Sequence, residues 1–309
     1  MNCWIILSLL IKRWNCDGGS FYLFYAFVWV ISFLPLGVLY IFSYLIYFLA
    51  YYVVKYRRAV VRTNLKNSFP ELSEKEIVRI EKGYYLHFAD IVMETVKLLQ
   101  ISDDEMRHRM QFSNPEVMGE FFENGKSVVI LLGHYGNWEW IPSIYMNYDG
   151  IVGGELYRPL NNKYFDQFFL KLRSRFGTVN IPKNDALRAI VNIRREGKTF
   201  GLGFIADQTP SASNLHYWNT FLNQDTPFLN GPERIARSGG YAVVYFDVKK
   251  IERGYYTCDI ITLTDDAKKT AENEITDKYV ELFEKTIRRD PTCWLWSHRR
   301  WKHKRVNPQ

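Results

Sequence analysis

The chain has 309 residues, 47% of them hydrophobic and 17% aromatic, which is enough for one large core or two small ones. A formal charge of +7 and a pI near 9.0 favour an anionic partner, such as nucleic acid, an acidic membrane surface or a phosphorylated lipid. Cys3, Cys16, Cys258 and Cys293 form no Cys-x-x-Cys pair, which argues against a disulfide framework or a zinc site and favours a reducing compartment.

Residues 1–20 form an N-terminal extension to which we assign no function. An apolar run at 4–11 is followed by Lys12, Arg13 and Asp17. The run is too short to cross a bilayer, and no basic region precedes it, so we do not expect a cleaved signal peptide.

The next segment, residues 20–54, contains no charged side chain. A helix needs about 20 apolar residues to cross a bilayer, and this segment is longer. We therefore predict a membrane anchor at 21–55. It is either one tilted transmembrane helix or a span that ends near Pro35-Leu36-Gly37 and continues as an interfacial helix. A helical hairpin buried in a soluble core is the alternative.

Basic residues follow the apolar segment directly, at Lys55, Arg57, Arg58, Arg62 and Lys66. Cationic residues next to a membrane span favour the cytoplasmic side. We therefore expect residues 56–309 to form a cytoplasmic domain.

Apolar periodicity predicts the elements of that domain. Ser73 and Glu76 form a capping-box pattern at the start of a long helix, and the apolar run 128–132 predicts a strand buried on both faces. Similar patterns predict helices from Asn161 or Asn162 to Gly177, at 185–195 and at 275–289, and strands at 199–205, 241–246 and 255–262. Strands that alternate with helices indicate one α/β domain, with a mixed, mostly parallel sheet flanked by helices.

The first candidate site is the stretch from Gly133 to Glu139, directly after the strand at 128–132. We expect the chain to turn at Gly133, present His134 and enter a helix near Asn137. On a regular helix the side chains of His134 and Glu139 would be roughly 140° apart, so they meet only if His134 lies on the loop. Glu139 would then orient the imidazole, His134 would accept a proton from a hydroxyl, and amides at the helix start would stabilise an oxyanion. An ordinary His–Glu hydrogen bond is the alternative.

Two more polar residues follow apolar segments. Asp207 comes directly after the strand at 199–205, and Arg158 follows the pair Ile151-Val152. Active groups of open α/β sheets collect at the carboxyl ends of strands, where an arginine can grip a phosphate. A surface arginine and a turn or cap aspartate are the alternatives.

The His-x4-Glu stretch resembles the motif of the bacterial lipid A biosynthesis acyltransferases, the lauroyl and myristoyl transferases that add secondary acyl chains. Other matches follow in family order from about residue 21 to 302: the uncharged segment ending in Tyr56-Arg57-Arg58, Asn64-Leu65-Lys66-Asn67-Ser68-Phe69-Pro70, Tyr157-Arg158-Pro159, Ala206-Asp207-Gln208, the turn from Phe228 to Gly231 leading to Ile235-Ala236-Arg237, and the ending from Trp294 to Lys302. The residues between His134 and Glu139 differ from the apolar residues common at these positions in the enterobacterial enzymes. This difference bears on which acceptor is used and on the length of the acyl chain, and not on the type of reaction.

The resemblance implies a membrane-anchored O-acyltransferase of lipopolysaccharide synthesis at the bacterial inner membrane. His134 would deprotonate a hydroxyl of a phosphorylated glucosamine disaccharide, and Glu139 would orient the imidazole. The acyl group would come from a thioester on acyl carrier protein or coenzyme A, with no other cofactor and no metal. Arg158 and Arg237 would engage the acceptor phosphate or the oxyanion, and Asp207 would position groups within the site.

Other hypotheses fit parts of the sequence. The same chemistry could act on a phosphatidylinositol mannoside, an aminolipid or a lysophospholipid, or a non-enzymatic membrane protein could bind anionic lipids. The basic tail at 299–305 would by itself suit nucleic acid or be a solvated terminus. Behind a membrane anchor it would suit lipid headgroups or an acidic carrier protein, so we expect no nucleic-acid partner.

Overall fold

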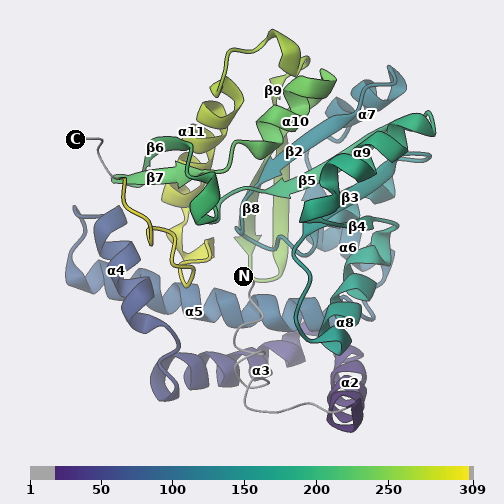
Figure 1. Cartoon of the computed structure of the whole chain (residues 1–309). Helices are drawn as coiled ribbons and strands as arrows, with labels where there is room; N and C mark the ends of the chain where they lie inside the picture. The colour runs from purple at the N-terminus through teal and green to yellow at the C-terminus, as the bar shows by residue number, and fades with distance from the viewer. Residues whose placement is uncertain (1–17, 306–309) are drawn as a thin grey trace.

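A seven-stranded sheet forms the centre of the computed structural model, which describes residues 18–305 (Figure 1). The strand order is β1-β9-β8-β2-β5-β3-β4; β8 and β9 are antiparallel, and the other neighbours are parallel. The sheet strands are β1 (Met110–Phe112), β2 (Val128–Leu132), β3 (Val152–Tyr157), β4 (Val179–Pro182), β5 (Phe200–Ile205), β8 (Ala242–Glu252) and β9 (Tyr255–Thr264), while β6 (Tyr217–Phe221) and β7 (Gln224–Phe228) form a separate hairpin. The predicted mixed, mostly parallel sheet is confirmed.

The predicted helices are also present, except the one expected to begin near Asn137. The helices are α2 (Gly18–Ser32), α3 (Leu36–Phe48), α4 (Arg58–Ser68), α5 (Glu74–Lys97), α6 (Asp103–Arg109), α7 (Glu116–Glu123), α8 (Lys163–Arg173), α9 (Ala186–Arg195), α10 (Gly231–Gly239) and α11 (Glu274–Arg289). Ser73 and Glu76 form the predicted capping box of α5, and the Asn162 side chain caps α8.

Helices cover both faces of the sheet, as expected. On one face, the hydroxyl of Tyr245 in β8 lies 2.8 Å from Thr286 Oγ1 of α11. On the other, a Cβ added to Gly201 of β5 would meet Phe122 of α7 and Tyr145 of the 3₁₀ helix η2 (Ile141–Asn147). Tyr245 pairs with Leu131 of β2, and Gly201 pairs with Val128, three residues earlier. Because side chains alternate between the two faces of a strand, Tyr245 and Gly201 lie on opposite faces of the sheet.

The uncharged N-terminal segment forms two helices. α2 ends at Ser32 and α3 begins at Leu36, so of the two alternatives the structure shows a break near Pro35 and not one continuous helix. Among the residues described, one helical stretch, Leu36–Val53, is long and apolar enough to cross a membrane. Almost all of the predicted extension at 1–20 lies outside the described residues.

One face of α3 packs along α5, beneath the sheet (Figure 1). This inner face is partly polar, since Ser43 donates a hydrogen bond to Asp90 at 2.7 Å. The outer surface of α2 and α3 exposes apolar side chains: Tyr22, Leu23, Phe27, Val30, Phe33, Ile41, Leu45 and Phe48. Apolar side chains of this layer therefore face outwards.

The α-helix expected to begin near Asn137 is absent, so that prediction is wrong. Residues 134–140 form turns, and Asn137 Oδ1 caps one of them by accepting from the Trp140 amide at 3.2 Å. The C-terminal segment holds this stretch: Gly136 N donates to the Cys293 carbonyl at 3.1 Å, and Leu295 N donates to the His134 carbonyl at 3.2 Å. Backbone bonds to residues more than 150 positions away replace the helical bonds that the local pattern suggested.

The basic C-terminal segment is only partly solvated. Arg300 is fully buried, with Nη2 donating to the Pro227 carbonyl at 2.6 Å and its guanidinium 4.6 Å from the ring centre of Phe228. Burial lowers the pKa of Arg300 to about 10. Arg300 is therefore a packing residue and is not available to the headgroups or carrier protein proposed for the tail as a whole.

Gly133→Ala is expected to lower the free energy of unfolding by about 1–3 kcal/mol, because close packing leaves no room for a methyl group. The added Cβ would lie 2.1 Å from the ring of Phe283 on α11. Gly203→Ala is the matched control: its Cβ would have its nearest neighbour at 3.7 Å. Urea unfolding measures the stability of both variants, and equal midpoints would contradict the close packing of Gly133 against Phe283.

Candidate active site

Strand register brings His134 and Asp207 together. β2 and β5 pair in parallel with Leu132 opposite Ile205, the last residue of each strand. His134 and Asp207 each follow two residues later, so they leave the sheet side by side at its carboxyl edge. The predicted position of both residues at strand ends is confirmed.

The side chains of His134 and Asp207 form a buried hydrogen-bonded pair. His134 Nδ1 lies 2.7 Å from Asp207 Oδ1, and Asp207 Oδ2 accepts from Trp294 Nε1 at 2.8 Å. Burial raises the pKa of Asp207, but the charge and hydrogen bond of His134, with the Trp294 bond, outweigh it and lower the pKa to about 2. Because an ionised carboxylate only accepts hydrogen bonds, Nδ1 carries the proton and Nε2 keeps its lone pair.

Glu139 does not make the hydrogen bond to His134 that was predicted for it, and Asp207 makes that bond instead. The Glu139 carboxylate pairs with Arg173 through two bonds of 3.2 Å and accepts from Trp138 Nε1 at 3.2 Å. Burial raises the pKa of Glu139, but Arg173, with smaller contributions from Trp138 and His134, lowers it overall. Without the expected helix, Glu139 turns towards α8, and Asp207 from the neighbouring strand takes the position beside the imidazole.

A second carboxyl group shares Arg173. Glu155 Oε1 on β3 lies 3.3 Å from Arg173 Nε, without hydrogen-bond geometry, and is otherwise unpartnered. Burial raises the pKa of Glu155 to about 7, with Arg173 opposing the shift and Glu139 adding to it. One guanidinium therefore serves two buried carboxyl groups and satisfies Glu139 better.

A cleft of about 400 Å³ is lined by His134, Glu139, Glu155 and Arg173. Of the five residues predicted from the sequence, His134, Glu139 and Arg158 line it. Asp207 is buried behind the imidazole, and Arg237, on α10, is not part of the lining.

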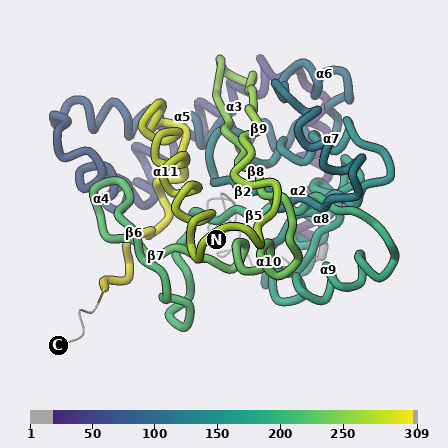
Figure 2. The backbone as a smooth tube through the Cα atoms, turned by 90° about the horizontal axis from the view of Figure 1, so that it is seen from above, coloured from purple at the N-terminus to yellow at the C-terminus, as the bar shows by residue number. Residues whose placement is uncertain are grey.

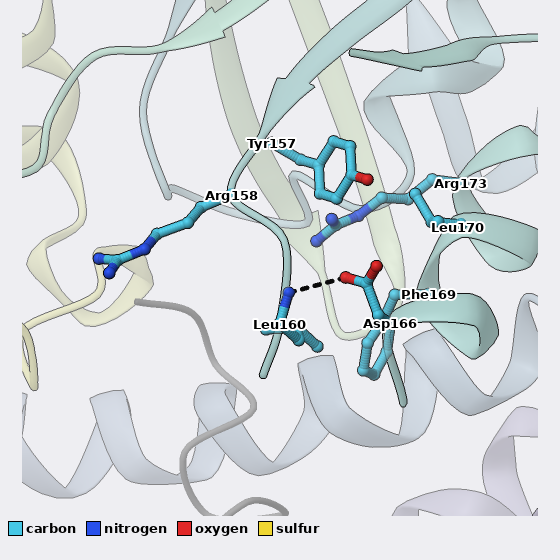
Figure 3. A pocket seen from close by; sticks show the side chains of 7 residues that line it. All are labelled: Tyr157, Arg158, Leu160, Asp166, Phe169, Leu170 and Arg173. Carbon is cyan, nitrogen blue, oxygen red and sulfur yellow. Dashed lines mark hydrogen bonds between the residues drawn. The ribbon is translucent and has the colours of Figure 1, made fainter. Parts of the chain in front are cut away.

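Basic side chains surround the opening of this cleft. Arg158, Lys183 and Lys302 are exposed and line it. Figure 3 shows the guanidinium of Arg158 extending away from Arg173, which points towards Tyr157. The unpaired positive charge therefore lies at the opening, while Arg173 is engaged by carboxylates inside.

An apolar cavity of about 30 Å³ adjoins the cleft. The two share Trp138, Glu155 and Ile205, and the smaller one is otherwise lined mainly by apolar residues, among them Ile130, Leu132, Ile141, Ile144 and Phe246. Glu155 therefore lies between the polar cleft and the apolar cavity.

Sequence reasoning missed four residues of the site: Glu155, Arg173, Gln208 and Trp294. The side-chain nitrogen of Gln208 lies 3.3 Å from His134 Nε2. Gln208 and Trp294 belong to matched motifs, which was a usable signal, but Glu155 and Arg173 looked like ordinary strand and helix residues. Within residues 18–305, no group of three or more His, Cys, Asp or Glu residues is arranged to hold a metal ion.

An imidazole fixed by a buried carboxylate, at the carboxyl edge of a mostly parallel sheet, is typical of α/β transferases and hydrolases that use acid–base chemistry. The family model described as bacterial lipid A biosynthesis acyltransferase matches residues 15–303. The chain belongs to this family and is an acyltransferase.

Individual relatives agree with this assignment. The chain is 24% identical to a lipid A biosynthesis acyltransferase of Haemophilus influenzae, over 80% of this chain and 78% of the relative. It is 24% identical to the lipid A biosynthesis palmitoleoyltransferase of Escherichia coli, over 82% and 81% of the two chains. It is 25% identical to the E. coli lipid A biosynthesis myristoyltransferase, over 46% and 43%.

Glu155→Gln is expected to reduce the pH dependence of stability. A carboxyl group whose folded pKa is raised from 4.5 to about 7 stabilises the fold fully below pH 4.5 and loses that contribution as the pH rises through 7. Relative to the variant, the wild type should lose roughly 2–3 kcal/mol across this interval. Urea unfolding at several pH values tests this, and a constant difference between the two proteins would contradict it.

Proposed function

We propose that this acyltransferase moves a fatty acyl chain from an acyl thioester to a hydroxyl of a lipid A precursor. The observation that carries the proposal is the His134–Asp207 pair beside a cleft with a basic opening, in a chain of this family. Arg158, Lys183 and Lys302 suit the phosphates of such a glycolipid, because cationic side chains form strong charge-assisted bonds with phosphate.

In the proposed reaction, His134 Nε2 takes the proton of the acceptor hydroxyl while the oxygen attacks the thioester carbonyl. Asp207 holds the Nδ1 proton in place and stabilises the imidazolium that forms. Collapse of the tetrahedral intermediate breaks the carbon–sulfur bond, and the departing thiolate recovers the proton from His134. The acyl group passes directly to the acceptor, without an acyl-enzyme.

The roles of the remaining predicted residues differ in their support. Arg158 is proposed to bind an acceptor phosphate, and its place at the cleft opening supports this. Arg237 lies outside the lining, so neither phosphate binding nor oxyanion stabilisation is assigned to it. Glu139, held by Arg173, is proposed to shape the cleft and to favour the cationic imidazole through its negative charge.

The donor is proposed to be acyl carrier protein or coenzyme A carrying the acyl chain, with no other cofactor. The apolar cavity beyond Trp138 and Ile205 would receive the part of the chain nearest the thioester. Its small volume leaves the rest of the chain in the adjoining cleft.

We further propose that α2 and α3 lie within one leaflet of the inner membrane, with the α/β domain in the cytoplasm. α3 is bound along α5 by hydrogen bonds from Tyr40 and Ser43, which a helix crossing the bilayer away from the domain would lose. Its opposite face is apolar and exposed, as in helices that insert parallel to a membrane surface. Lys55 and Arg57, just beyond this layer, would meet anionic headgroups.

His134→Ala and Asp207→Asn are each expected to lower kcat by about a hundredfold or more, because one loses the proton acceptor and the other the charge that orients it. His216→Ala, at an exposed histidine outside the cleft lining, is the matched control and should retain activity. Mass spectrometry of the product formed from a phosphorylated disaccharide acceptor and an acyl carrier protein thioester measures the effect. Full activity of His134→Ala would refute the general-base assignment.

Mass spectrometry of lipid A from cells lacking the protein tests the acceptor. Loss of one acyl chain, restored by the wild type and not by His134→Ala, would support a lipid A precursor as acceptor. An unchanged lipid A together with a change elsewhere in the lipid extract would contradict it and indicate another lipid acceptor.

Paired substitutions Ile41→Asp and Leu45→Asp are expected to release the protein from vesicles containing anionic phospholipid. Each removes an apolar side chain worth roughly 1.5–3 kcal/mol when buried, so the partition coefficient should fall by about a hundredfold or more. Leu187→Asp on α9, at a position as exposed as Ile41 but on another element, is the control. Equal vesicle binding by both proteins would contradict docking through α3.

A further inference from the structure

Glu94 is a completely buried carboxylate on α5, and it does not line the cleft. Its Oε1 accepts from the Tyr40 hydroxyl of α3 at 2.9 Å. Its Oε2 accepts from Asn137 Nδ2 at 2.7 Å and from the Tyr256 hydroxyl of β9 at 2.9 Å. All three partners donate to the carboxyl oxygens, so α3, β9 and the turn after His134 meet on one side chain. Burial, with the nearby Asp90, raises the pKa of Glu94, and the hydrogen bonds from Tyr256 and Tyr40 oppose that shift.

Asn137 transmits this anchorage to the turn. It is completely buried and uses both ends of its carboxamide: Nδ2 donates to Glu94, and Oδ1 accepts from the Trp140 amide at 3.2 Å. The carbonyl of Glu94 also accepts from Trp140 Nε1 at 3.3 Å. Both ends of the stretch from Asn137 to Trp140 are therefore tied to the same residue.

The anchored stretch carries two residues that line the cleft. The ring of Trp138 packs edge-on against the imidazole of His134, with ring centres 5.4 Å apart, and Glu139 forms the ion pair with Arg173. The preceding residues are held differently, since Gly136 is bonded to Cys293 and His134 to Leu295 through the backbone. Glu94 and Arg173 are thus the two polar anchors of the second half of the turn, Glu94 holding its ends and Arg173 holding Glu139.

We propose that Glu94 is a positioning residue for acyl transfer, acting through Asn137 to hold Trp138 and Glu139 in place beside His134. This inference rests on the proposed function of the cleft, because it assigns the turn to that reaction. Tyr40 and Tyr256 supply the other two bonds to the carboxylate. The Tyr256 ring also packs edge-on against Trp140, with ring centres 5.8 Å apart, a contact that does not involve its hydroxyl.

The test removes the acceptor at position 94 and then restores it. Glu94→Leu cannot accept from Asn137, so it loses the bond to the turn. Glu94→Gln keeps this bond, because its carboxamide oxygen can accept from Asn137 and Tyr256 while its amide donates to the Tyr40 hydroxyl, which can rotate to accept. Glu94→Leu is expected to lower kcat by about tenfold or more, and Glu94→Gln to remain within about threefold of the wild type.

Tyr256→Phe is the matched control, because it removes a donor from the same carboxylate oxygen and leaves Asn137 in place. It should change kcat by less than about twofold, although it removes a buried hydrogen bond. All variants are assayed well below their thermal midpoints. A merely structural role would lower those midpoints and leave kcat of the folded protein unchanged. Wild-type kcat in Glu94→Leu, or a loss in Glu94→Gln or Tyr256→Phe as large as in Glu94→Leu, would overturn the proposal.

Hydrogen exchange of the Trp140 amide provides a readout that needs no acceptor. This amide is expected to exchange about tenfold faster or more in Glu94→Leu and to stay protected in Glu94→Gln. Unchanged exchange in Glu94→Leu would overturn the positioning role whatever the assay shows. Absence of product from the wild type would instead count against the proposed function.

Discussion

The parallel pairing of β2 with β5 is the constraint on which the site depends. Because Leu132 and Ile205 lie opposite each other as the last residues of their strands, the residues two positions later emerge as neighbours. A slip of one residue would move one side chain to the other face of its strand and separate His134 from Asp207. Helices on both faces prevent that slip by burying all five residues of β2.

The carboxyl groups around the cleft have different hydrogen-bond and ion-pair partners, and their pKa values are shifted in different directions as a result. Asp207 has two hydrogen-bond donors and stays ionised, with a pKa near 2. Glu139 and Glu155 compete for Arg173, and the one with better geometry has the lowered pKa. The pKa of each of these three carboxyl groups is therefore shifted in a direction set by its partners, since burial alone would raise all three.

The N-terminal layer is apolar on both sides. Its inner side combines buried apolar residues, such as Leu36 and Leu39, with polar contacts such as Ser43 with Asp90, and its outer side exposes apolar side chains. Figure 2, viewed from above, and Figure 1 both place α2 beside α8, and Phe21 contacts Phe165 at a ring separation of 5.1 Å. The apolar layer thus continues into the helix that supplies Arg173, which brings the proposed membrane surface close to the cleft.

The sequence by itself determined the periodic elements: the buried strand at 128–132, the capped helix α5 and the alternation that makes a mostly parallel sheet. It also indicated His134, Asp207 and Arg158, because strand ends are where such groups collect. Only the tertiary structure decided the partners. The spacing of Glu139 and His134 predicted a hydrogen bond between them. Asp207, 73 residues from His134, makes that bond instead, and Trp294 donates to the other oxygen of Asp207. Local patterns record which backbone bonds a segment can make with itself, whereas strand register and the returning C-terminal segment determine which side chains meet.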